Sequence, residues 1–334
     1  MPTSQLITDN LFEKVLLEPA KRGARELFVL SGYASASMVT KHFDVAFKDL
    51  SIDLAIDLHI GMSGRDGLSR NTLLGLQSIP RQIGDRSFNC SLNVKGTSNH
   101  SKIYVWCDEK GPKEAYLGSS NYTQLGFGIS ATASTHKEVC IAMDPIAGFD
   151  YIMASSKGGI SYKSPDIANF IDLLDEQPLS KIAIEEPAVA VSSKPFVDLP
   201  LVMSRQPDQG EVHQKSGLNW GQREGRNPDQ AYIPVPSAIA KSRFFPAKGE
   251  HFQMITDDGE AFICTVAQDN DKAIETPNDN SILGKYFRKR LNLSSGTFID
   301  KKHLQAFGSN SVRIYKDSDD CYRLSFQPGR YIEL

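Results

Sequence analysis

The sequence predicts two domains, an α/β domain followed by a domain built mainly of short β-strands. Three observations support this. The length of 334 residues exceeds what one hydrophobic core usually organises. The first half alternates strand-like and helix-like runs, a βαβ order that favours a parallel or mixed sheet. From residue 201 onward the strands are short and the turns frequent, a spacing that suits a small β-barrel.

A change of composition separates the two domains. Residues 178–200 hold four prolines and show no clear helical or strand period, which is typical of an interdomain linker. We therefore place the first domain at residues 1–178, the linker at residues 179–200 and the second domain at residues 201–334.

The expected elements of the first domain alternate between helix and strand. Helical spacing of apolar residues indicates the helices, and short apolar runs bounded by turn residues indicate the strands. In chain order we expect a helix over residues 10–20, a strand over 26–30, a helix over 36–48, a strand over 52–60, a glycine-rich loop over 61–67, a helix over 69–77, a strand over 87–94 and a mostly helical segment over 144–176. The glycine-rich loop suits a functional loop and a plain connector equally well.

The second domain is expected to contain short strands and two helices. An Asp-Asp-Gly turn separates the first two strands, which indicates a hairpin. We expect strands over residues 252–256, 261–267, 312–315 and 322–326, and helices over residues 280–290 and 300–307.

The residues best suited to catalysis lie between positions 98 and 139. His100 and Lys102 stand at positions i and i+2 beside a strand-forming run over residues 101–106. Residues at that spacing in a strand face the same side. The sequence therefore predicts that an imidazole and an ammonium group point into one space.

Two further strand ends follow this pair. A short strand over residues 114–117 ends at a G-S-S-N corner, which brings Ser119 and Asn121 to a strand end. Glu138 then opens an apolar strand over residues 139–143. Hydroxyl, amide and carboxylate groups are thus expected near the imidazole.

This set of groups suits phosphodiester hydrolysis. A neutral imidazole such as that of His100 can attack phosphorus and form a phosphohistidine, and a second imidazole can protonate the leaving oxygen. Lys102, Ser119 and Asn121 can donate to the equatorial oxygens, and Glu138 can accept from the other ring nitrogen of a histidine. Such a scheme needs no metal. Each motif alone occurs often by chance, and the order and spacing of the set make it informative.

The order H-x-K, G-S-x-N and then Glu resembles the phospholipase D superfamily over about residues 1–175. Two positions depart from its pattern. Cys107 stands where Asp is frequent, a change that the nuclease branch tolerates better than the lipases, and His136 stands where Asn is common. The resemblance implies an α/β sandwich with a mixed sheet, no cofactor, and the catalytic residues His100, Lys102, Ser119, Asn121 and Glu138.

Charge is distributed unevenly along the chain. The net charge is −3, so no global basic field indicates nucleic-acid binding. Residues 201–334 hold 18 Lys and Arg and 17 Asp and Glu, but the cations cluster. Residues 285–290 contain four of them, and the loop over residues 218–228 offers Arg, Gln and Asn, which pair with base edges in the major groove. A solvated surface accounts for either cluster equally well.

The second domain resembles the B-three DNA-binding pseudobarrel of plant transcription factors. The stretches that support this are L-N-W-G-Q-R, A-Y-I-P-V-P, R-F-F-P, F-Q-M-I-T-D-D-G and N-D-N-S-I-L-G-K-Y-F-R. The resemblance implies seven strands and two arms that grip the major groove, here residues 215–227 and 276–290. It implies DNA contacts by Trp220, Gln222, Arg223, Arg226, Asn227, Asn278, Asn280, Lys285, Tyr286 and Arg288.

The full length, nuclease-like half first and pseudobarrel second, resembles NgoAVII-type restriction endonucleases of the NgoFVII family and is similar in plan to BfiI. This resemblance implies a type II site-specific enzyme that acts on double-stranded DNA. Because the chain holds one H-x-K motif, it implies a homodimer through the N-terminal domain. It also implies a companion methyltransferase and leaves an ATPase subunit open.

The remaining composition is consistent with a prokaryotic cytoplasmic enzyme. Five scattered cysteines without a Cys-x-x-Cys pair indicate neither a zinc site nor a disulfide framework. The N-terminus lacks a signal-peptide pattern, and no 18-residue apolar run indicates a membrane partner. Two alternatives stay open: a phospholipase D-type phosphodiesterase acting on lipids or nucleotides, and a DNA-binding regulator with an inactive nuclease fold.

Overall fold

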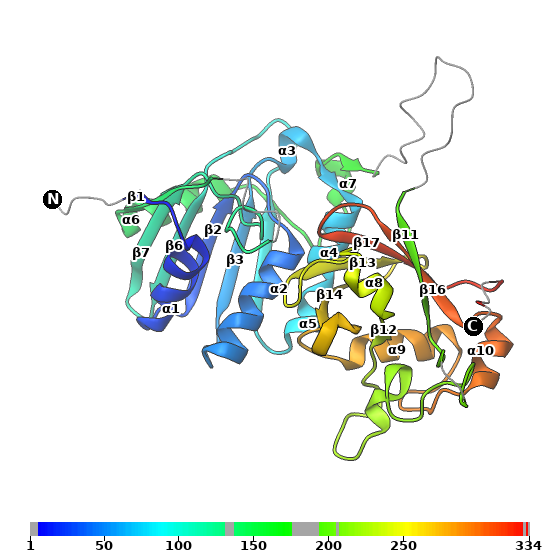
Figure 1. Cartoon of the computed structure of the whole chain (residues 1–334). Coiled ribbons are helices and arrows are strands. Elements are labelled where there is room, and N and C mark those ends of the chain that lie inside the picture. Colours follow the sequence, from blue (N-terminus) through cyan, green and yellow to red (C-terminus); the bar gives the residue numbers. More distant parts are fainter. Residues whose placement is uncertain (1–5, 131–136, 176–193, 205–206, 330–331, 333–334) are drawn as a thin grey trace. The chain divides into compact units, whose positions relative to one another are not determined.

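The computed structural model describes residues 6–130, 137–175, 194–204, 207–329 and 332, and it divides into two compact units, Met1–Glu176 and Gln177–Leu334 (Figure 1). Each unit contains its own main sheet. Strand β11 (Phe196–Pro200) pairs within the second sheet, so the linker expected over residues 179–200 extends too far. The part of that linker before residue 194 lies outside the described residues.

The first unit contains an eight-stranded sheet within the described residues, and this sheet is mixed, as expected from the sequence. The pairs β2–β3 and β3–β5 are parallel, and the other neighbours are antiparallel. In spatial order the strands are β1 (Leu6–Ile7), β8 (Cys140–Met143), β7 (Gly111–Gly118), β6 (Ile103–Asp108), β2 (Glu26–Ser31), β3 (Ala55–Ile60), β5 (Ser87–Leu92) and β9 (Ile160–Ser161).

Helices border this sheet. The helix expected over residues 10–20 is a π-helical segment, Phe12–Leu17, followed by α1 (Glu18–Lys21). The others are α2 (Ala36–Asp44), η2 (Val45–Asp49), α3 (Ser63–Asp66), α4 (Arg70–Ser78), α5 (Pro80–Ile83), α6 (Pro145–Ser156) and α7 (Ile167–Phe170). The segment expected to be mostly helical after residue 144 also contains β9 and β10 (Leu173–Leu174), which pairs with β4 (Leu68–Ser69).

Strand β6 lies in the centre of the first unit and is covered on both faces. On one face Ile103 and Val105 form a core cluster with Ile152 of α6. From the other face, the indole Nε1 of Trp106 donates to the carbonyl oxygen of Val15, at 2.8 Å. A strand buried on both faces reads as a nearly continuous apolar run, which explains the sequence I-Y-V-W-C.

The second unit is a seven-stranded sheet within the described residues, as the B-three resemblance implies. The edge strands β11 and β12 contact each other, so the sheet is a nearly closed barrel. In spatial order the strands are β11 (Phe196–Pro200), β16 (Ser311–Lys316), β17 (Cys321–Ser325), β13 (His251–Thr256), β14 (Ala261–Ala267), β15 (Ala273–Glu275) and β12 (Ile233–Pro234).

Buried aromatic side chains dominate the core of the second unit. Phe252 of β13, Phe262 of β14, Tyr322 of β17 and Phe287 of α9 belong to one cluster. Its helices are η5 (Gly217–Gln222), α8 (Ser237–Lys241), η6 (Asp269–Asp271), α9 (Ser281–Arg290) and α10 (Lys301–Phe307). Helices α9 and α10 match the two that the sequence predicts. No described helix of either unit is long and apolar enough to cross a membrane.

Candidate active site and DNA-binding surface

The candidate catalytic residues of the first unit lie where β2 and β3 end and β6 begins. The register of β2 and β6 places Leu30 opposite Ile103 in antiparallel pairing. The residues that follow β2 therefore lie beside those that precede β6. Ala34, just after β2, forms a bridge with Tyr122, just after the G-S-S-N corner. Three chain segments thus meet at one edge of the sheet.

His100 and Lys102 are in contact, but not for the reason that the sequence suggests. Strand β6 begins at Ile103, so both residues precede the strand. Lys102 is 6% exposed, and its Nζ lies 2.7 Å from the carbonyl oxygen of His100 and 3.1 Å from Nδ1 of its ring. Desolvation lowers the pKa of Lys102, and the charge of Glu138 opposes that shift. The His100 side chain itself is exposed.

The contact with Lys102 determines the tautomer of the His100 ring. A charged lysine has only donors, so Nδ1 of a neutral His100 ring accepts and its proton lies on Nε2. In this tautomer Nε2 has no free lone pair, so the ring can attack phosphorus through Nε2 only after the proton has moved to Nδ1. To act as a general acid, the ring must first be protonated on both nitrogens.

Ser119 and Glu138 form a second pair. The hydroxyl of Ser119 donates to the Glu138 carboxylate and accepts from the backbone N–H of Val139, at 3.0 Å. No hydrogen bond joins Glu138 to His100 within the described part of the chain. His136, which stands where the phospholipase D superfamily commonly has Asn, lies outside the described residues.

The side-chain amide of Asn121 has a fixed orientation. Its Oδ1 accepts from the backbone N–H of Tyr33 at 3.2 Å and lies 3.5 Å from the hydroxyl of Ser31. Ser31 also accepts from the backbone N–H of Tyr122 at 2.9 Å. With the oxygen held in this way, the Nδ2 group is the side of the amide that can donate to a phosphate oxygen.

A buried hydrogen-bond chain anchors the G-S-S-N corner. Tyr122 donates through its hydroxyl to Nδ1 of His42 at 2.8 Å, and Nε2 of His42 donates to the carbonyl oxygen of Leu16 at 3.0 Å. Burial lowers the pKa of His42 to about 4, so this ring is neutral near pH 7. Tyr104 adds a bond to the carbonyl oxygen of Ser120, at 2.6 Å. These bonds tie the corner to the core.

Sequence reasoning missed Gly32 and Tyr33, which lie against the candidate catalytic residues. A Cβ atom at Gly32 would lie 2.8 Å from Cδ2 of His100 and 3.3 Å from Oδ1 of Asn121. The Tyr33 ring meets the His100 ring edge to face, with centroids 5.8 Å apart. The only sequence signal for these two residues is their position in the S-G-Y segment at the end of a buried strand.

In the second unit, the first expected arm presents an exposed cation cluster. Arg226 stacks on Trp220, with its guanidinium carbon 4.0 Å from the ring centroid, and bonds to Gln230 at 2.9 Å. Arg223 donates through Nε to the carbonyl oxygen of Lys215 at 2.7 Å, which leaves its two terminal nitrogens for other acceptors. Arg223, Arg226 and Asn227 are exposed.

Three of the expected DNA-contact residues serve the fold instead. Arg288 and Tyr286 are 1% and 3% exposed, and Gln222 donates to the carbonyl oxygens of Pro228 and Gly296, at 3.2 and 3.1 Å. Arg288 and Tyr286 therefore do not belong to the contact surface, because neither side chain reaches the outside of the unit. Gln222 instead holds the first arm.

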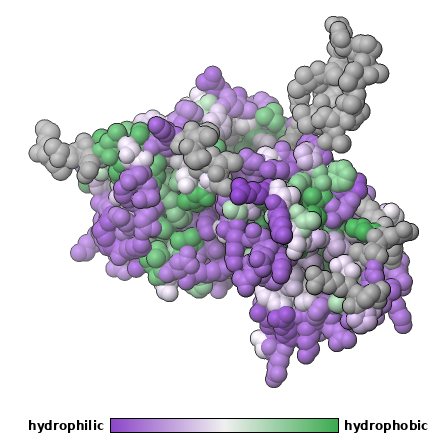
Figure 2. Space-filling model, in the orientation of Figure 1, coloured by the Kyte–Doolittle hydropathy of each residue, from purple (hydrophilic) through white to green (hydrophobic). Residues whose placement is uncertain are grey.

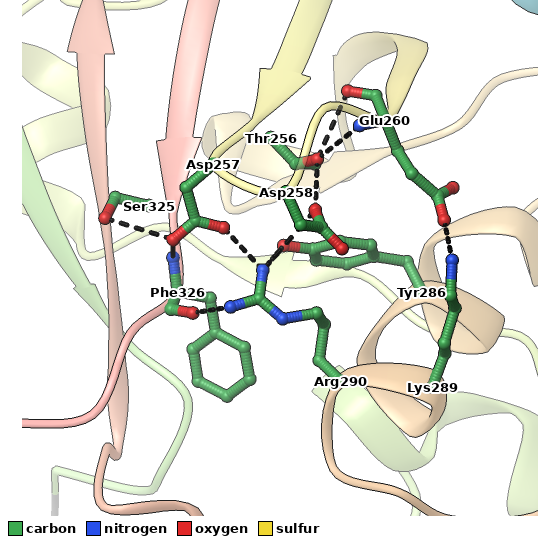
Figure 3. A network of polar contacts seen from close by, with 9 residues as sticks. All are labelled: Thr256, Asp257, Asp258, Glu260, Tyr286, Lys289, Arg290, Ser325 and Phe326. Atoms are coloured by element: carbon green, nitrogen blue, oxygen red, sulfur yellow. Dashed lines mark hydrogen bonds and ion pairs between the residues drawn. The ribbon is translucent and has the colours of Figure 1, made fainter.

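The basic cluster on α9 is largely used within the domain. Arg290 turns inward to Asp257, Tyr286 and the carbonyl oxygen of Phe326, and Lys289 pairs with Glu260 (Figure 3). Lys285 is exposed and forms no ion pair within the described residues. Of the four cations, Lys285 is thus the one best placed for a phosphate.

Two asparagines before α9 each have a buried side-chain amide atom that lacks a hydrogen-bond partner within the described residues. These atoms are Asn278 Nδ2 and Asn280 Oδ1. Both belong to the second expected arm. No group of three or more His, Cys, Asp or Glu within the described residues is arranged to hold a metal ion.

Two family models match the chain. The NgoFVII restriction endonuclease N-terminal PLD domain matches residues 9–168, and the NgoFVII C-terminal B3-like DNA-binding domain matches residues 191–318. No curated protein matches the chain.

Solved structures with a similar fold each cover about half of the chain. NucT from Helicobacter pylori is 12% identical, with a TM-score of 0.33, and the match covers 48% of this chain and 98% of NucT. Polyphosphate kinase from Porphyromonas gingivalis is 17% identical, with a TM-score of 0.29, over 49% of this chain and 26% of the kinase. A hypothetical Arabidopsis thaliana protein is 11% identical, with a TM-score of 0.22, over 42% of this chain and 99% of that protein.

Proposed function

Because the chain belongs to the NgoFVII restriction endonuclease family, we propose that it is a type II enzyme that cuts double-stranded DNA at a specific sequence without a metal ion. The observation that supports the chemistry best is the convergence of His100, Lys102 and Asn121 at one edge of the first sheet. A restriction role further implies a companion methyltransferase.

The proposed reaction has two displacements at phosphorus. Nε2 of one His100 ring, with the ring proton on Nδ1, attacks phosphorus, so that a P–N bond forms and a P–O bond of the DNA breaks. The doubly protonated ring of His100 of the partner subunit gives its Nε2 proton to the leaving oxygen and becomes neutral. Water then attacks the phosphohistidine, the P–N bond breaks, and the partner's His100 takes the proton of that water. Lys102 and the Nδ2 group of Asn121 stabilise the negative charge on the equatorial oxygens, and Ser119 adds a third donor when its hydroxyl turns from Glu138 to the phosphate.

Cleavage should proceed in EDTA. In this scheme an imidazole replaces the metal-activated water as the nucleophile, so chelation leaves the rate of plasmid cleavage within about twofold of that in magnesium. Incubation of the purified protein with plasmid in EDTA, followed by end mapping of the fragments, tests this and gives the cut positions. Activity that disappears in EDTA and returns with magnesium contradicts the proposed mechanism.

The proposed two-histidine site requires two chains, and helix α6 offers a surface for the second copy. Its outward residues include Ile146 and Met153, which are 61% and 48% exposed. Figure 2 shows hydrophobic residues gathered in the part of the first unit where Figure 1 places α6 and β1. On the same helix, Tyr151 lies 3.3 Å from Asn99 Nδ2 and 3.4 Å from Ser101 Oγ, so this surface is continuous with the His100 segment.

The protein should be a dimer, and charges on α6 should dissociate it. Replacing Ile146 and Met153 together with glutamate places like charges in a buried interface, which strongly disfavours association. We expect sedimentation to show a dimer for the wild type and for residues 1–178, and a monomer without cleavage for the double variant. Phe170→Glu, at a residue 47% exposed on α7, is the matched control. A wild-type monomer that cleaves at a rate linear in concentration contradicts the proposal.

Recognition should depend on the first arm. A bidentate arginine–guanine pair discriminates by about 1–3 kcal/mol, whereas a phosphate contact weakens all sequences alike. We expect Arg223→Ala or Arg226→Ala to lower specific binding about 10- to 100-fold with far less effect on nonspecific DNA. Lys285→Ala should weaken both and flatten the salt dependence. Binding to cognate and scrambled duplexes at several salt concentrations measures both effects, and an equal loss on both duplexes for the arginine variants refutes base recognition by this arm.

A further inference from the structure

Tyr33 is an exposed aromatic residue beside His100 that the proposed chemistry does not use. Its side chain is 43% exposed, and its ring meets the His100 ring at an interplanar angle of 77°. The hydroxyl donates to the carboxylate of Asp66 on α3, and the backbone N–H donates to Asn121. A ring held at both ends loses little entropy when a ligand packs against it.

A cation lies next to this ring. Arg65 precedes Asp66 on α3, its side chain is 71% exposed, and its Nε is 3.7 Å from Asp66 Oδ1. The hydrogen bond to Asp66 raises the pKa of Tyr33, and the charge of Arg65 opposes that shift. Tyr33 and Arg65 are therefore both exposed and both lie against Asp66, and the Tyr33 ring lies next to the candidate nucleophile.

The loop that bears α3 is fixed relative to His100. A Cβ at Gly61 would lie 2.0 Å from the carbonyl oxygen of Asn99, and one at Gly64 would lie 2.0 Å from that of Val94. The backbone N–H of Asn99 also donates to the carbonyl oxygen of Gly61, at 2.8 Å. Glycine allows this close approach of two backbones, and it joins the loop to the segment that ends at His100.

A tyrosine paired with an aspartate often does no more than fasten one loop to another. That role does not require an aromatic face in water, nor an exposed arginine beside it. The two groups match the two parts of a nucleotide instead, because aromatic rings pack against sugars and bases and guanidinium groups pair with phosphates.

We propose that Tyr33 and Arg65 bind the nucleotide that flanks the scissile phosphate. Tyr33 packs against its sugar and base, and Arg65 pairs with its phosphate. This inference rests on the proposed nuclease function and adds to it a subsite that holds the DNA strand in line with His100. The glycine-rich loop over residues 61–67 is then a functional loop rather than a connector.

The test is a double-mutant cycle between protein and DNA. Cleavage rates of wild type and Tyr33→Ala are measured under single turnover on a cognate duplex, and on duplexes with a three-carbon spacer in place of either nucleotide next to the mapped cut. Arg65→Ala is paired in the same way with an uncharged methylphosphonate at the neighbouring phosphate. Phe47→Ala, which removes a ring of similar exposure (48%) elsewhere in the first unit, is the control.

We expect Tyr33→Ala to slow cleavage of the intact duplex about 10- to 100-fold, and to have almost no further effect on one of the two spacer duplexes. Arg65→Ala should behave likewise with the methylphosphonate. If Tyr33→Ala costs the same factor on all three duplexes, its ring acts only on His100 and the subsite is refuted. If the wild type cuts none of the duplexes, the nuclease function fails and the subsite fails with it.

Discussion

Replacing His100 with alanine should abolish cleavage and leave specific DNA binding within about twofold of the wild type. In the proposed homodimer one substitution removes the nucleophile and the general acid together, so we expect a loss of at least about 10⁴-fold in the cleavage rate. Binding persists because the proposed recognition surface lies in the second unit, which has its own core. Single-turnover cleavage and a binding titration on the same cognate duplex measure both quantities.

Gly32→Ala gives an independent test of the same site. The backbone of Gly32 is not in the left-handed region, so alanine is tolerated there, but its Cβ would lie 2.8 Å from the His100 ring. Cleavage should fall although the nucleophile is still present. Ala168→Ser, at an exposed position on α7 away from the proposed dimer surface, is the control. Full activity of His100→Ala would place the chemistry elsewhere.

Mixed dimers separate the two roles of His100. If each active site needs one histidine from each protomer, a dimer of one wild-type and one His100→Ala chain is inactive, because it lacks either the nucleophile or the acid. Titration of wild-type protein with the variant before cleavage should then reduce activity as the square of the wild-type fraction. A linear decrease indicates that each chain acts alone.

The sequence correctly predicted those strands that are joined by a turn with a recognisable local sequence. Strands β13 and β14 are joined by the Asp-Asp-Gly turn, in which Thr256 N–H donates to the carbonyl oxygen of Glu260 at 2.8 Å, and the expected ranges agree with the observed ones to within one residue. Strands β12 and β15 were not expected. They have two and three residues, too few to show a period, and only their pairing in the sheet defines them.

Prediction of the candidate site is limited in the same way, because only features within a short stretch of sequence can be predicted. The spacing of His100 and Lys102 is local and led to the prediction that the two side chains share one space, although the strand on which that prediction relied begins only at Ile103. The position of Gly32 and Tyr33 was not predicted, because it follows from the pairing of β2 with β6 in a register that no short stretch encodes. On α9 the sequence shows four cations but not which of them face inward. Burial of an arginine depends on partners far along the chain, such as Asp229 for Arg288.

Arg288→Ala should destabilise the second domain more than any exposed substitution discussed above. Its Nε donates to the carbonyl oxygen of Thr297 at 2.8 Å, its Nη2 to that of Pro228 at 3.1 Å, and Nε lies 3.4 Å from Asp229 Oδ1. Burial lowers the pKa of Arg288, and the charge of Asp229 opposes that shift. Removing the cation leaves a buried carboxylate and unpaired carbonyl groups, which costs about 3–5 kcal/mol.

A loss of that size should lower the midpoint of thermal unfolding of this domain by roughly 10–20 °C, measurable by calorimetry on the full chain. Specific binding should fall as well, because Pro228 directly follows the first arm. Lys285→Ala, on the exposed side of the same helix, is the matched control and should leave the midpoint nearly unchanged. Adding Asp229→Asn to Arg288→Ala removes the unpaired charge, so the double variant should regain part of the loss. If the effects of the two substitutions on the midpoint simply add, the carboxylate of Asp229 does not depend on Arg288. The loss of stability in Arg288→Ala then comes from lost packing.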